Sequence, residues 1–381
     1  MSDTARYIYV VCQVGAEGVL KNELAREWPE LHLSYSRPGL VTFKWTGSDE
    51  LPDEVDLRST FARAYGFSLG RLVGTEAVSM AADFWKMAGD RHFPHLHVWQ
   101  RDVSVPGHRG YEPGVSPLCG EVADAICAAA APVIHGGRPP QANNRARSGD
   151  YVMDCIVVEP NEWLVGYHLA NSVASRYPGG VCLPMKRDED VISRAYWKMM
   201  EALTWSQLPV VRGDKCVEIG SAPGGASQAL LRAGLHVTGI DPAEMDEELL
   251  EHPRFTHVRK RAGDMKRREF RGIRWLMADS NVVPDRTLAM VEDIVTHREV
   301  NVRGLLLTLK LPEWELAEHI PEYVTRVRSW GFRYVRTRQL AFNRQEICLA
   351  ALRDRTLRRA PRTKRARPTS PPPTGTQPGD A

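Results

Sequence analysis

Apolar positions in the C-terminal half of the chain fall into short runs separated by segments of helical periodicity. From about residue 190, strand-like runs alternate with helix-like stretches, which is typical of a doubly wound sheet of parallel strands. The predicted strands of this sheet are 216–220, 236–240, 255–259, 275–279 and 304–310. A last pair, 333–340 and 347–352, is joined by a short polar connection and predicts an antiparallel hairpin at the sheet edge.

The N-terminal half shows a different pattern, in which strands and helices do not alternate regularly. Strand-like runs at 7–14 and 40–45 flank a stretch of helical spacing at 16–28, which indicates a small α/β module over residues 1–65. A second block, 66–175, contains strand candidates at 95–102, 151–159 and 162–170 and an alanine-rich helix at 120–134. We therefore expect two small α+β units, then an α/β domain over 176–354, and a tail over 355–381 whose composition predicts disorder.

Composition narrows the class of protein. With 43% hydrophobic and 25% charged residues, the chain resembles an ordinary globular protein. Its seven cysteines are scattered, with no CxxC pair, which argues against a disulfide framework and a cysteine-based zinc site. Neither a signal peptide nor an apolar run long enough for a membrane span is evident. We expect a cytoplasmic protein without a membrane or metal partner.

The net charge of +3 is unevenly distributed. The tail from Arg355 carries seven basic residues and one acid, so the rest of the chain is close to −3. A nucleic-acid site must then be a local patch, because binding to phosphates depends on clustered charge. Residues 254–274 carry nine Lys/Arg against two acids, although a solvated charged face is an equal alternative. The candidate RNA contacts in this stretch are Arg259, Lys260, Arg261, Lys266, Arg267 and Arg268.

The sequence EIGSAPGG, residues 218–225, follows a predicted strand and begins a helix. Its glycines permit a tight turn and close approach to a ligand, and the helix offers unpaired N–H groups. Asp241 ends the next strand, where a carboxylate can accept hydrogen bonds from ribose hydroxyls. The glycine series of a dinucleotide site is broken here, and Glu218 suits the ammonium of S-adenosylmethionine, so we expect that cofactor. The predicted contacts are Glu218, Gly220, Ser221, Ala222, Pro223, Gly224, Gly225, Asp241, Asp264 and Asp279.

Four ionisable residues are expected to converge near this loop. Asp279 and Lys310 end predicted strands, Glu346 begins the last one, and Lys198 lies in the helix that enters the domain. Ligands bind at the carboxyl ends of strands in open α/β sheets. A solvated surface position is the plain alternative for each lysine. The apolar run before Lys310 favours burial of its amine, which prepares a lysine to accept a proton.

In order and context, these four residues resemble the Lys-Asp-Lys-Glu tetrad of FtsJ-like ribose 2′-O-methyltransferases. The segments EIGSAPGGASQ, ADSNVVP, LTLKLP and NRQEICL are most similar to the ribosomal RNA large subunit methyltransferase M family. The resemblance is specific over residues 175–352 and looser before them. It implies a Rossmann-like methyltransferase sheet, mostly parallel with an antiparallel edge strand, preceded by ferredoxin-like and THUMP-type RNA-binding modules.

The resemblance also implies an activity, which is methylation of a cytidine 2′-hydroxyl in 23S ribosomal RNA or a pre-50S particle. Lys310 would be the general base, Asp279 and Glu346 would orient the two lysines, and Lys198 would hold the hydroxyl or the developing oxyanion. Two alternatives remain. One is a base-directed RNA methyltransferase, although ADSNVVP lacks the Pro-Pro-aromatic run of amino-directed enzymes. The other is an inert RNA-binding protein that retains the fold.

Overall fold

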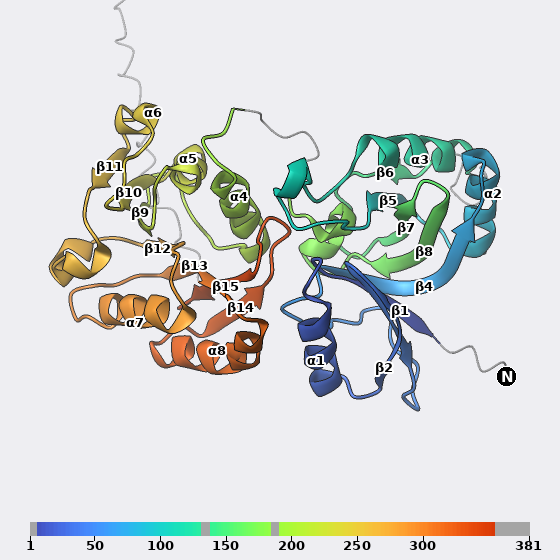
Figure 1. Ribbon diagram of the computed structural model, residues 1–381, viewed down its shortest axis with the longest axis horizontal. Helices are drawn as coiled ribbons and strands as arrows, with labels where there is room; N and C mark the ends of the chain where they lie inside the picture. The colour runs from blue at the N-terminus through green and yellow to red at the C-terminus, as the bar shows by residue number, and fades with distance from the viewer. Residues whose placement is uncertain (1–5, 131–137, 184–189, 355–381) are drawn as a thin grey trace, which may run out of the picture.

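The computed structural model describes residues 6–130, 138–183 and 190–354, which form two regions, each built on one sheet (Figure 1). In Figure 1 the N-terminal region, coloured blue to green, lies beside the C-terminal region, coloured yellow to red. The tail 355–381, for which we predicted disorder, lies outside the described residues, as do 131–137 at the end of the predicted alanine-rich helix. No helix in the described ranges is long and apolar enough to cross a membrane.

The N-terminal region is a single eight-stranded sheet in the order β2-β3-β1-β4-β8-β7-β5-β6. Its strands are β1 Tyr7–Val11, β2 Leu31–Arg37, β3 Leu40–Trp45, β4 Ala64–Val73, β5 His95–Gln100, β6 Gln141–Ala142, β7 Tyr151–Glu159 and β8 Glu162–Leu169. Its helices are α1 Glu17–Glu27, α2 Ala77–Ala88 and α3 Pro117–Ala128. The pairings are antiparallel except at β5, which is parallel to β6 and β7.

Strand β4 joins the two predicted N-terminal blocks. It pairs with β1 of the first block along one side and with β8 of the second along the other. The blocks therefore share one continuous sheet instead of forming two separate ones. The strands β2 and β4 and the helix α2 were not predicted. The assignment of the blocks to ferredoxin-like and THUMP-type modules stays a prediction.

The C-terminal region has the predicted doubly wound sheet, in the order β11-β10-β9-β12-β13-β15-β14. Its strands are β9 Lys215–Ile219, β10 His236–Ile240, β11 Phe255–Val258, β12 Trp275–Ala278, β13 Gly304–Lys310, β14 Tyr334–Arg338 and β15 Glu346–Leu352. Its helices are α4 Ala195–Ser206, α5 Gly225–Arg232, α6 Glu247–Leu250, α7 Pro284–Val295 and α8 Ile320–Ser329. The mostly parallel Rossmann-like sheet is confirmed. Its antiparallel member, β15, lies one position inside the edge, between β13 and β14.

The two regions are held together close to the C-terminal ends of the parallel strands. Thr60 and Thr337 share a hydrogen bond of 2.7 Å between their hydroxyls. The guanidinium of Arg338, at the end of β14, donates to the carbonyl of Arg63 at 2.6 Å. Because ligands of open α/β sheets bind at this end, the N-terminal region lies next to the edge that carries the predicted chemistry.

Candidate active site

The four predicted tetrad residues meet at the C-terminal edge of the sheet. Lys310 is the last residue of β13 and lies directly opposite Glu346, the first residue of β15, in the antiparallel register. Asp279 follows β12 immediately, and Lys198 projects from the first turn of α4. Four segments that are distant in sequence therefore bring their ionisable groups to one place, as the sequence predicts.

The side chains form a closed ring in which ammonium and carboxylate groups alternate. The Lys198 Nζ lies 2.8 Å from the Asp279 Oδ2 and 2.7 Å from the Glu346 Oε1. The Lys310 Nζ lies 3.1 Å from the Asp279 Oδ1 and also contacts the Glu346 Oε2. Each acid bridges both lysines, and each lysine bridges both acids, so displacement of one member alters the other three.

Burial and charge act in opposite directions on this ring. Burial would lower the pKa of Lys198, but the carboxylates of Asp279 and Glu346 outweigh it, and the pKa is raised above its usual value. Burial would raise the pKa of Glu346, yet the ammonium groups of Lys198 and Lys310 lower it to about 2. At neutral pH, Lys198 is therefore a cation and Glu346 an anion, which suits Lys198 to stabilise negative charge.

Two residues that the sequence did not single out support the ring. Asn343 donates from Nδ2 to the Glu346 Oε1 at 3.0 Å. Glu201, fully buried one turn after Lys198 on α4, accepts hydrogen bonds from the backbone N–H groups of Ala341 at 3.0 Å and Phe342 at 3.2 Å. Glu201 thus fixes the loop that carries Asn343. The sequence feature that could have identified Glu201 is its charge at a position of α4 that faces inward.

Cavities lie on two sides of the ring. On the inner side, Lys198 and Asp279 line a small cavity together with Glu218 of the glycine-rich loop. On the outer side, Lys310 and Glu346 line a cavity of about 570 Å³, together with Asn281, Arg286 and Arg344. The two lysines therefore differ in what they face, since only Lys310 lines the outer cavity.

The glycine-rich loop has the close approaches that its sequence predicts. Gly220 has a φ of +80°, and a Cβ there would lie 2.4 Å from the carbonyl oxygen of Asp279. Gly224 has a φ of +124°, and a Cβ there would lie 2.0 Å from the Leu249 Cδ1. Side chains are excluded at both positions, and α5 begins directly after Gly224 without a side-chain cap. The backbone N–H groups of this helix start are therefore free of side-chain partners.

Glu218 is a buried carboxyl group without a cationic partner among the described residues. It is 2% exposed and accepts a hydrogen bond from the Ser227 hydroxyl. Burial raises its pKa to about 8, and the nearby charges of Asp279 and Asp241 add to that rise. A cation in the adjacent cavity would offset the free-energy cost of keeping this buried carboxyl group ionised.

The other predicted cofactor residues are placed differently from one another. Asp241 follows β10 and accepts hydrogen bonds from the backbone N–H groups of Ala222, at 3.2 Å, and Ala243, at 2.8 Å. Asp241 therefore holds the loop 218–225 in place through its hydrogen bond with Ala222, apart from its predicted contact with a ligand. Ser221 is buried, and its hydroxyl lies 3.6 Å from the Met245 Sδ. Asp264 is exposed, and no contact joins its side chain to the loop.

Four of the six candidate RNA contacts are arginines, and two of these are paired with acids. Arg259 pairs with Glu244 at 3.2 Å and Arg267 with Asp293 at 2.6 Å. The remaining candidates, Lys260, Arg261, Lys266 and Arg268, are exposed and have no ion pair within the described ranges. They follow β11, the outermost strand, which is four strand positions from β13 and therefore roughly 19 Å along the sheet from Lys310.

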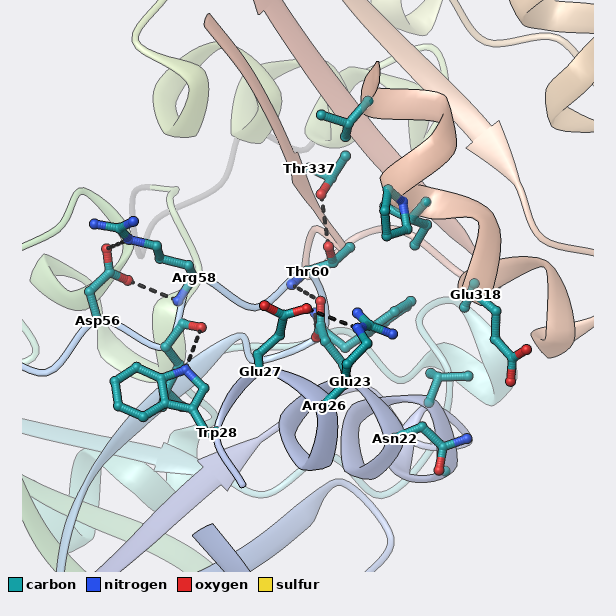
Figure 2. A pocket seen from close by; sticks show the side chains of 18 of the residues that line it. Asn22, Glu23, Arg26, Glu27, Trp28, Asp56, Arg58, Thr60, Glu318 and Thr337 are labelled. Carbon is teal, nitrogen blue, oxygen red and sulfur yellow. Dashed lines mark hydrogen bonds and ion pairs between the residues drawn. The ribbon is translucent and has the colours of Figure 1, made fainter. Parts of the chain in front are cut away.

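A cavity of about 1060 Å³ lies elsewhere, between α1 and α8 (Figure 2). Figure 2 shows acidic Glu23 and Glu27 near basic Arg26 on its walls, and Arg58 beside Asp56. It contains neither a member of the ring nor a residue of the loop 218–225. The predicted catalytic and cofactor residues therefore do not line this cavity.

Comparisons with known proteins show which family part of this chain is similar to. The FtsJ-like methyltransferase family profile matches residues 191–320. The ribosomal RNA large subunit methyltransferase M of Pseudoalteromonas translucida is 26% identical over 55% of this chain and 58% of its own length. The protein of the same name from Alkalilimnicola ehrlichii is 32% identical over 42% of this chain and 46% of its own. The chain thus spans about half the length of the curated relatives that it matches.

Among solved structures, Aeropyrum pernix fibrillarin with bound S-adenosyl-L-methionine covers 52% of this chain and 81% of its own. The identity is 16% and the TM-score 0.33, so this similarity carries no argument about the site.

Proposed function

From the premise that residues 191–320 form an FtsJ-like methyltransferase domain, we propose that this chain methylates a ribose 2′-hydroxyl of RNA, with S-adenosylmethionine as the methyl donor. The closed Lys-Asp-Lys-Glu ring beside the glycine-rich loop is the observation that carries the proposal. The names of its relatives support large-subunit ribosomal RNA as the target, and the resemblance of its sequence motifs to that family supports a cytidine of 23S ribosomal RNA.

The cofactor fits the residues at the loop. Glu218 offers a buried carboxyl that lacks a cation, and the amino-acid part of S-adenosylmethionine carries an ammonium group. Asp241, at the end of β10, is the proposed acceptor for the ribose hydroxyls, and the start of α5 presents N–H groups. The bound cofactor supplies an electrophilic methyl group on a positively charged sulfur.

Lys310 is the proposed general base because it faces the side from which a substrate can enter. The formal charges of two ammonium and two carboxylate groups cancel within the ring. An additional positive charge beside the ring favours loss of one ammonium proton. Lys310 then accepts the proton of the 2′-hydroxyl through its neutral amine, while Lys198 stays cationic and stabilises the developing oxyanion.

A methyl-transfer assay with ribosomal RNA from cells that lack this protein tests the proposal. Lys310→Ala should lower the rate by about 10²–10⁴-fold, the usual contribution of a general base, and leave cofactor binding nearly unchanged. Lys215→Ala is the matched control, because Lys215 is exposed at the opposite edge of the same sheet. Full activity of Lys310→Ala would refute the assignment. RNA binding without methyl transfer by the unmodified chain would favour the inert alternative.

Mapping of the product distinguishes ribose from base methylation. A 2′-O-methyl group blocks alkaline cleavage of the adjacent phosphodiester, so nuclease digestion and mass spectrometry should locate the methyl group on a ribose. A methyl group on a base would favour the base-directed alternative instead.

We propose that the basic stretch after β11 contacts RNA phosphates. Replacement of Lys260, Arg261 and Arg268 with Gln should reduce the slope of log affinity against log salt by roughly 2, on the scale of 0.7–0.9 per phosphate contact. The control is the triple replacement of Lys215, Arg298 and Arg333, which removes the same charge from exposed positions at the opposite ends of the strands. Equal slopes for the two triple variants would contradict an RNA contact in this stretch.

With its seven free cysteines, the chain is suited to a reducing compartment, and we place the reaction in the cytoplasm.

A further inference from the structure

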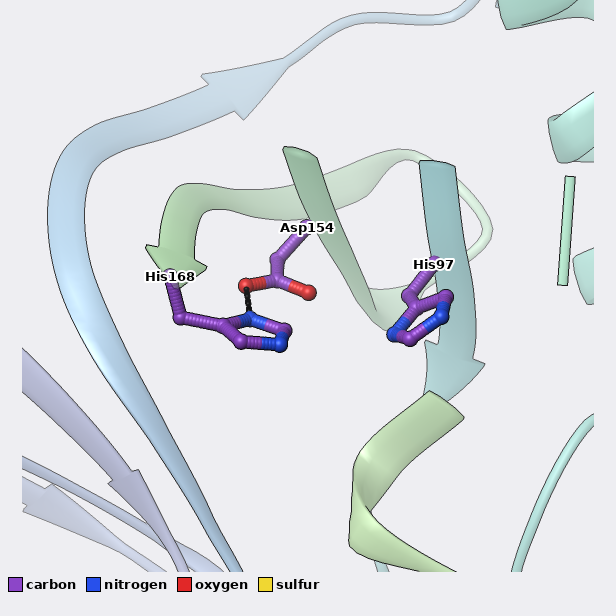
Figure 3. Close-up of side chains that lie close together, drawn as sticks. All are labelled: His97, Asp154 and His168. Atoms are coloured by element: carbon purple, nitrogen blue, oxygen red, sulfur yellow. Dashed lines mark hydrogen bonds and ion pairs between the residues drawn. The ribbon is translucent and has the colours of Figure 1, made fainter. Parts of the chain in front are cut away.

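Two histidines and one aspartate meet in the interior of the N-terminal region, far from the ring in sequence and fold. His97 on β5 lies directly opposite Asp154 on β7 in the parallel register. His168 on β8 lies two residues beyond Gly166, the residue opposite Asp154, so all three side chains share one face of the sheet. Figure 3 shows them directed toward one another. One nitrogen or oxygen atom from each lies within 4.8 Å of the others.

The hydrogen bonds of this cluster leave two acceptor atoms without a donor. The His97 Nε2 lies 3.1 Å from the carbonyl oxygen of Asn144, which can only accept, so this nitrogen carries the proton. With its proton on Nε2, a neutral His97 ring holds a lone pair on Nδ1. That Nδ1 and the Asp154 Oδ1 have no partner among the described residues, although both side chains are fully buried.

His168, like His97, places its Nε2 on a backbone carbonyl, but its Nδ1 already has a partner. The His168 Nε2 lies 2.6 Å from the carbonyl oxygen of Ser175 and must donate to it. Its Nδ1 lies 2.6 Å from the Asp154 Oδ2, which also accepts from the Tyr9 hydroxyl. Both imidazoles thus anchor Nε2 on a backbone carbonyl and direct Nδ1 toward the carboxylate. Metal-ligating histidines typically have this arrangement, since the outer hydrogen bond fixes the ring and its tautomer.

We propose that His97, Asp154 and His168 form a zinc site, with the two Nδ1 atoms and the Asp154 Oδ1 as ligands. Two imidazoles and one carboxylate suit zinc better than magnesium or calcium, which prefer oxygen ligands. Zinc replaces the proton on the His168 Nδ1, which is released to the solvent, and a water molecule completes the tetrahedron. The ligand atoms move closer together, because neighbouring ligands around tetrahedral zinc lie roughly 3.3 Å apart.

The surroundings give this site a structural role. A Cβ at Gly66 would lie 2.8 Å from the Tyr9 hydroxyl, and one at Gly166 would lie 2.6 Å from the Tyr9 Cε1, so the two glycines make room for the tyrosine to reach Asp154. Ser175 belongs to the segment that leads from β8 toward α4. Zinc would therefore fasten this connecting segment to the sheet through His168.

Metal analysis of the full chain tests the proposal independently of methyl transfer. The protein is stripped with a chelator, reloaded with zinc, desalted and analysed by mass spectrometry for bound metal. We expect about one zinc per chain, as for a closed protein site, and at least a tenfold loss of zinc in His97→Gln and Asp154→Asn. His95→Gln is the matched control, because His95 lies on the same strand, is buried and pairs with Asp150 instead; it should retain the metal.

A second measurement needs no variant and remains decisive if a substitution prevents folding. Cobalt added to the stripped protein should give the intense visible bands of a tetrahedral site, and an equivalent of zinc should abolish them. Absence of these bands together with no retained zinc would overturn the proposal. Retention of zinc by His97→Gln at the level of the unmodified chain would also overturn it, since the metal would then be held elsewhere.

Discussion

The proposed contact between Glu218 and the cofactor predicts how cofactor binding should depend on pH. Burial raises the pKa of this carboxyl group to about 8 in the cofactor-free protein. A cationic ammonium group beside it favours the carboxylate, so its pKa falls on binding and a proton is released. Affinity should therefore increase as the pH rises toward about 8, because less free energy is then spent on ionising Glu218.

The size of the effect follows from the pKa. At pH 6 about 1% of the carboxyl groups are ionised, and at pH 7.5 about a quarter, which gives a rise in affinity of roughly twentyfold, or about 1.8 kcal/mol. Above pH 7.5 the ammonium group of the ligand itself begins to lose its proton, with an ordinary pKa of about 7.8, and opposes the trend. The comparison is therefore best confined to pH 6–7.5.

Isothermal titration calorimetry with S-adenosylhomocysteine measures this dependence, because that ligand keeps the ammonium group and is not consumed. Titrations in two buffers of different ionisation enthalpy should show release of close to one proton at pH 6. Glu218→Gln should bind more weakly at pH 7.5, with an affinity that hardly changes over the range. A pH-independent affinity in the unmodified protein, or the same slope in both proteins, would refute the reasoning.

Three further outcomes are expected. Without cofactor, the pKa of Glu218 is higher in the folded protein than in the unfolded chain, so the free energy of unfolding should fall as the pH rises from the unfolded-state pKa toward about 8. In Glu218→Gln the melting temperature should depend less on pH over that window. Arg63→Met should destabilise the protein by about 3–5 kcal/mol in urea titrations, since it leaves the buried Asp102 carboxylate unpaired; the exposed Arg71→Met should cost less than about 0.5 kcal/mol. Glu201→Gln should lower the single-turnover rate roughly tenfold and leave the cofactor affinity unchanged in calorimetry, because it displaces only the loop beside the ring.

The C-terminal region could be predicted from the sequence because its parallel strands β9, β10, β12 and β13 are short, largely apolar runs, each with a helix after it. The predicted strand 304–310 has the same limits as β13, and 275–279 differs from β12 by one residue. Parallel strands all end at one edge, so the residues at those ends, Asp279 and Lys310, could be brought together without knowledge of the contacts. Alternation of elements was therefore sufficient to place two of the four ring members.

The N-terminal region was harder to predict because its strands do not share one clear pattern. The strand β2, LHLSYSR, buries only its first residue and is exposed along most of its length, so it has no apolar face to detect. Strand β4 pairs with β1 along one side and with β8 along the other, and both partners are distant from it in the sequence. The pattern of residues within β4 does not specify these partners. The sequence pattern therefore indicated an α+β region but did not show that its two blocks share one continuous sheet.

The partners of buried polar residues also could not be predicted from the sequence. Asp154 interrupts an otherwise apolar strand, YVMDCIVVE, and a charge in such a position is costly unless it is paired. That signal identifies a buried polar contact but not its partners, because His97 and His168 lie on two other strands. Glu201 on α4 is a parallel case, since its backbone partners follow β14.

The N-terminal region also reaches the edge that carries the ring. The carboxylate of Glu112 pairs with Arg194 at 2.8 Å, immediately before α4, and the carbonyl of Pro106 accepts a hydrogen bond from Arg344 at 3.0 Å. These two arginines precede the segments that contribute Lys198 and Glu346, respectively. One loop of the N-terminal region therefore contacts both segments.

That loop begins at the most strongly buried ion pair of the N-terminal region. Asp102 accepts from the Arg63 Nη2 at 2.7 Å and from the Tyr111 hydroxyl at 2.7 Å, so its carboxylate ties both ends of the loop to the sheet. Arg63 in turn donates from Nε to the carbonyl of Gly179, in the segment that connects the two regions. Because the charges of Arg63 and Asp102 are buried away from water, few other conformations of this loop would have a similar free energy. The position of two ring members thus depends on packing in a region that contributes no ionisable group to the ring, and the catalytic region and its N-terminal neighbour act as one structural unit.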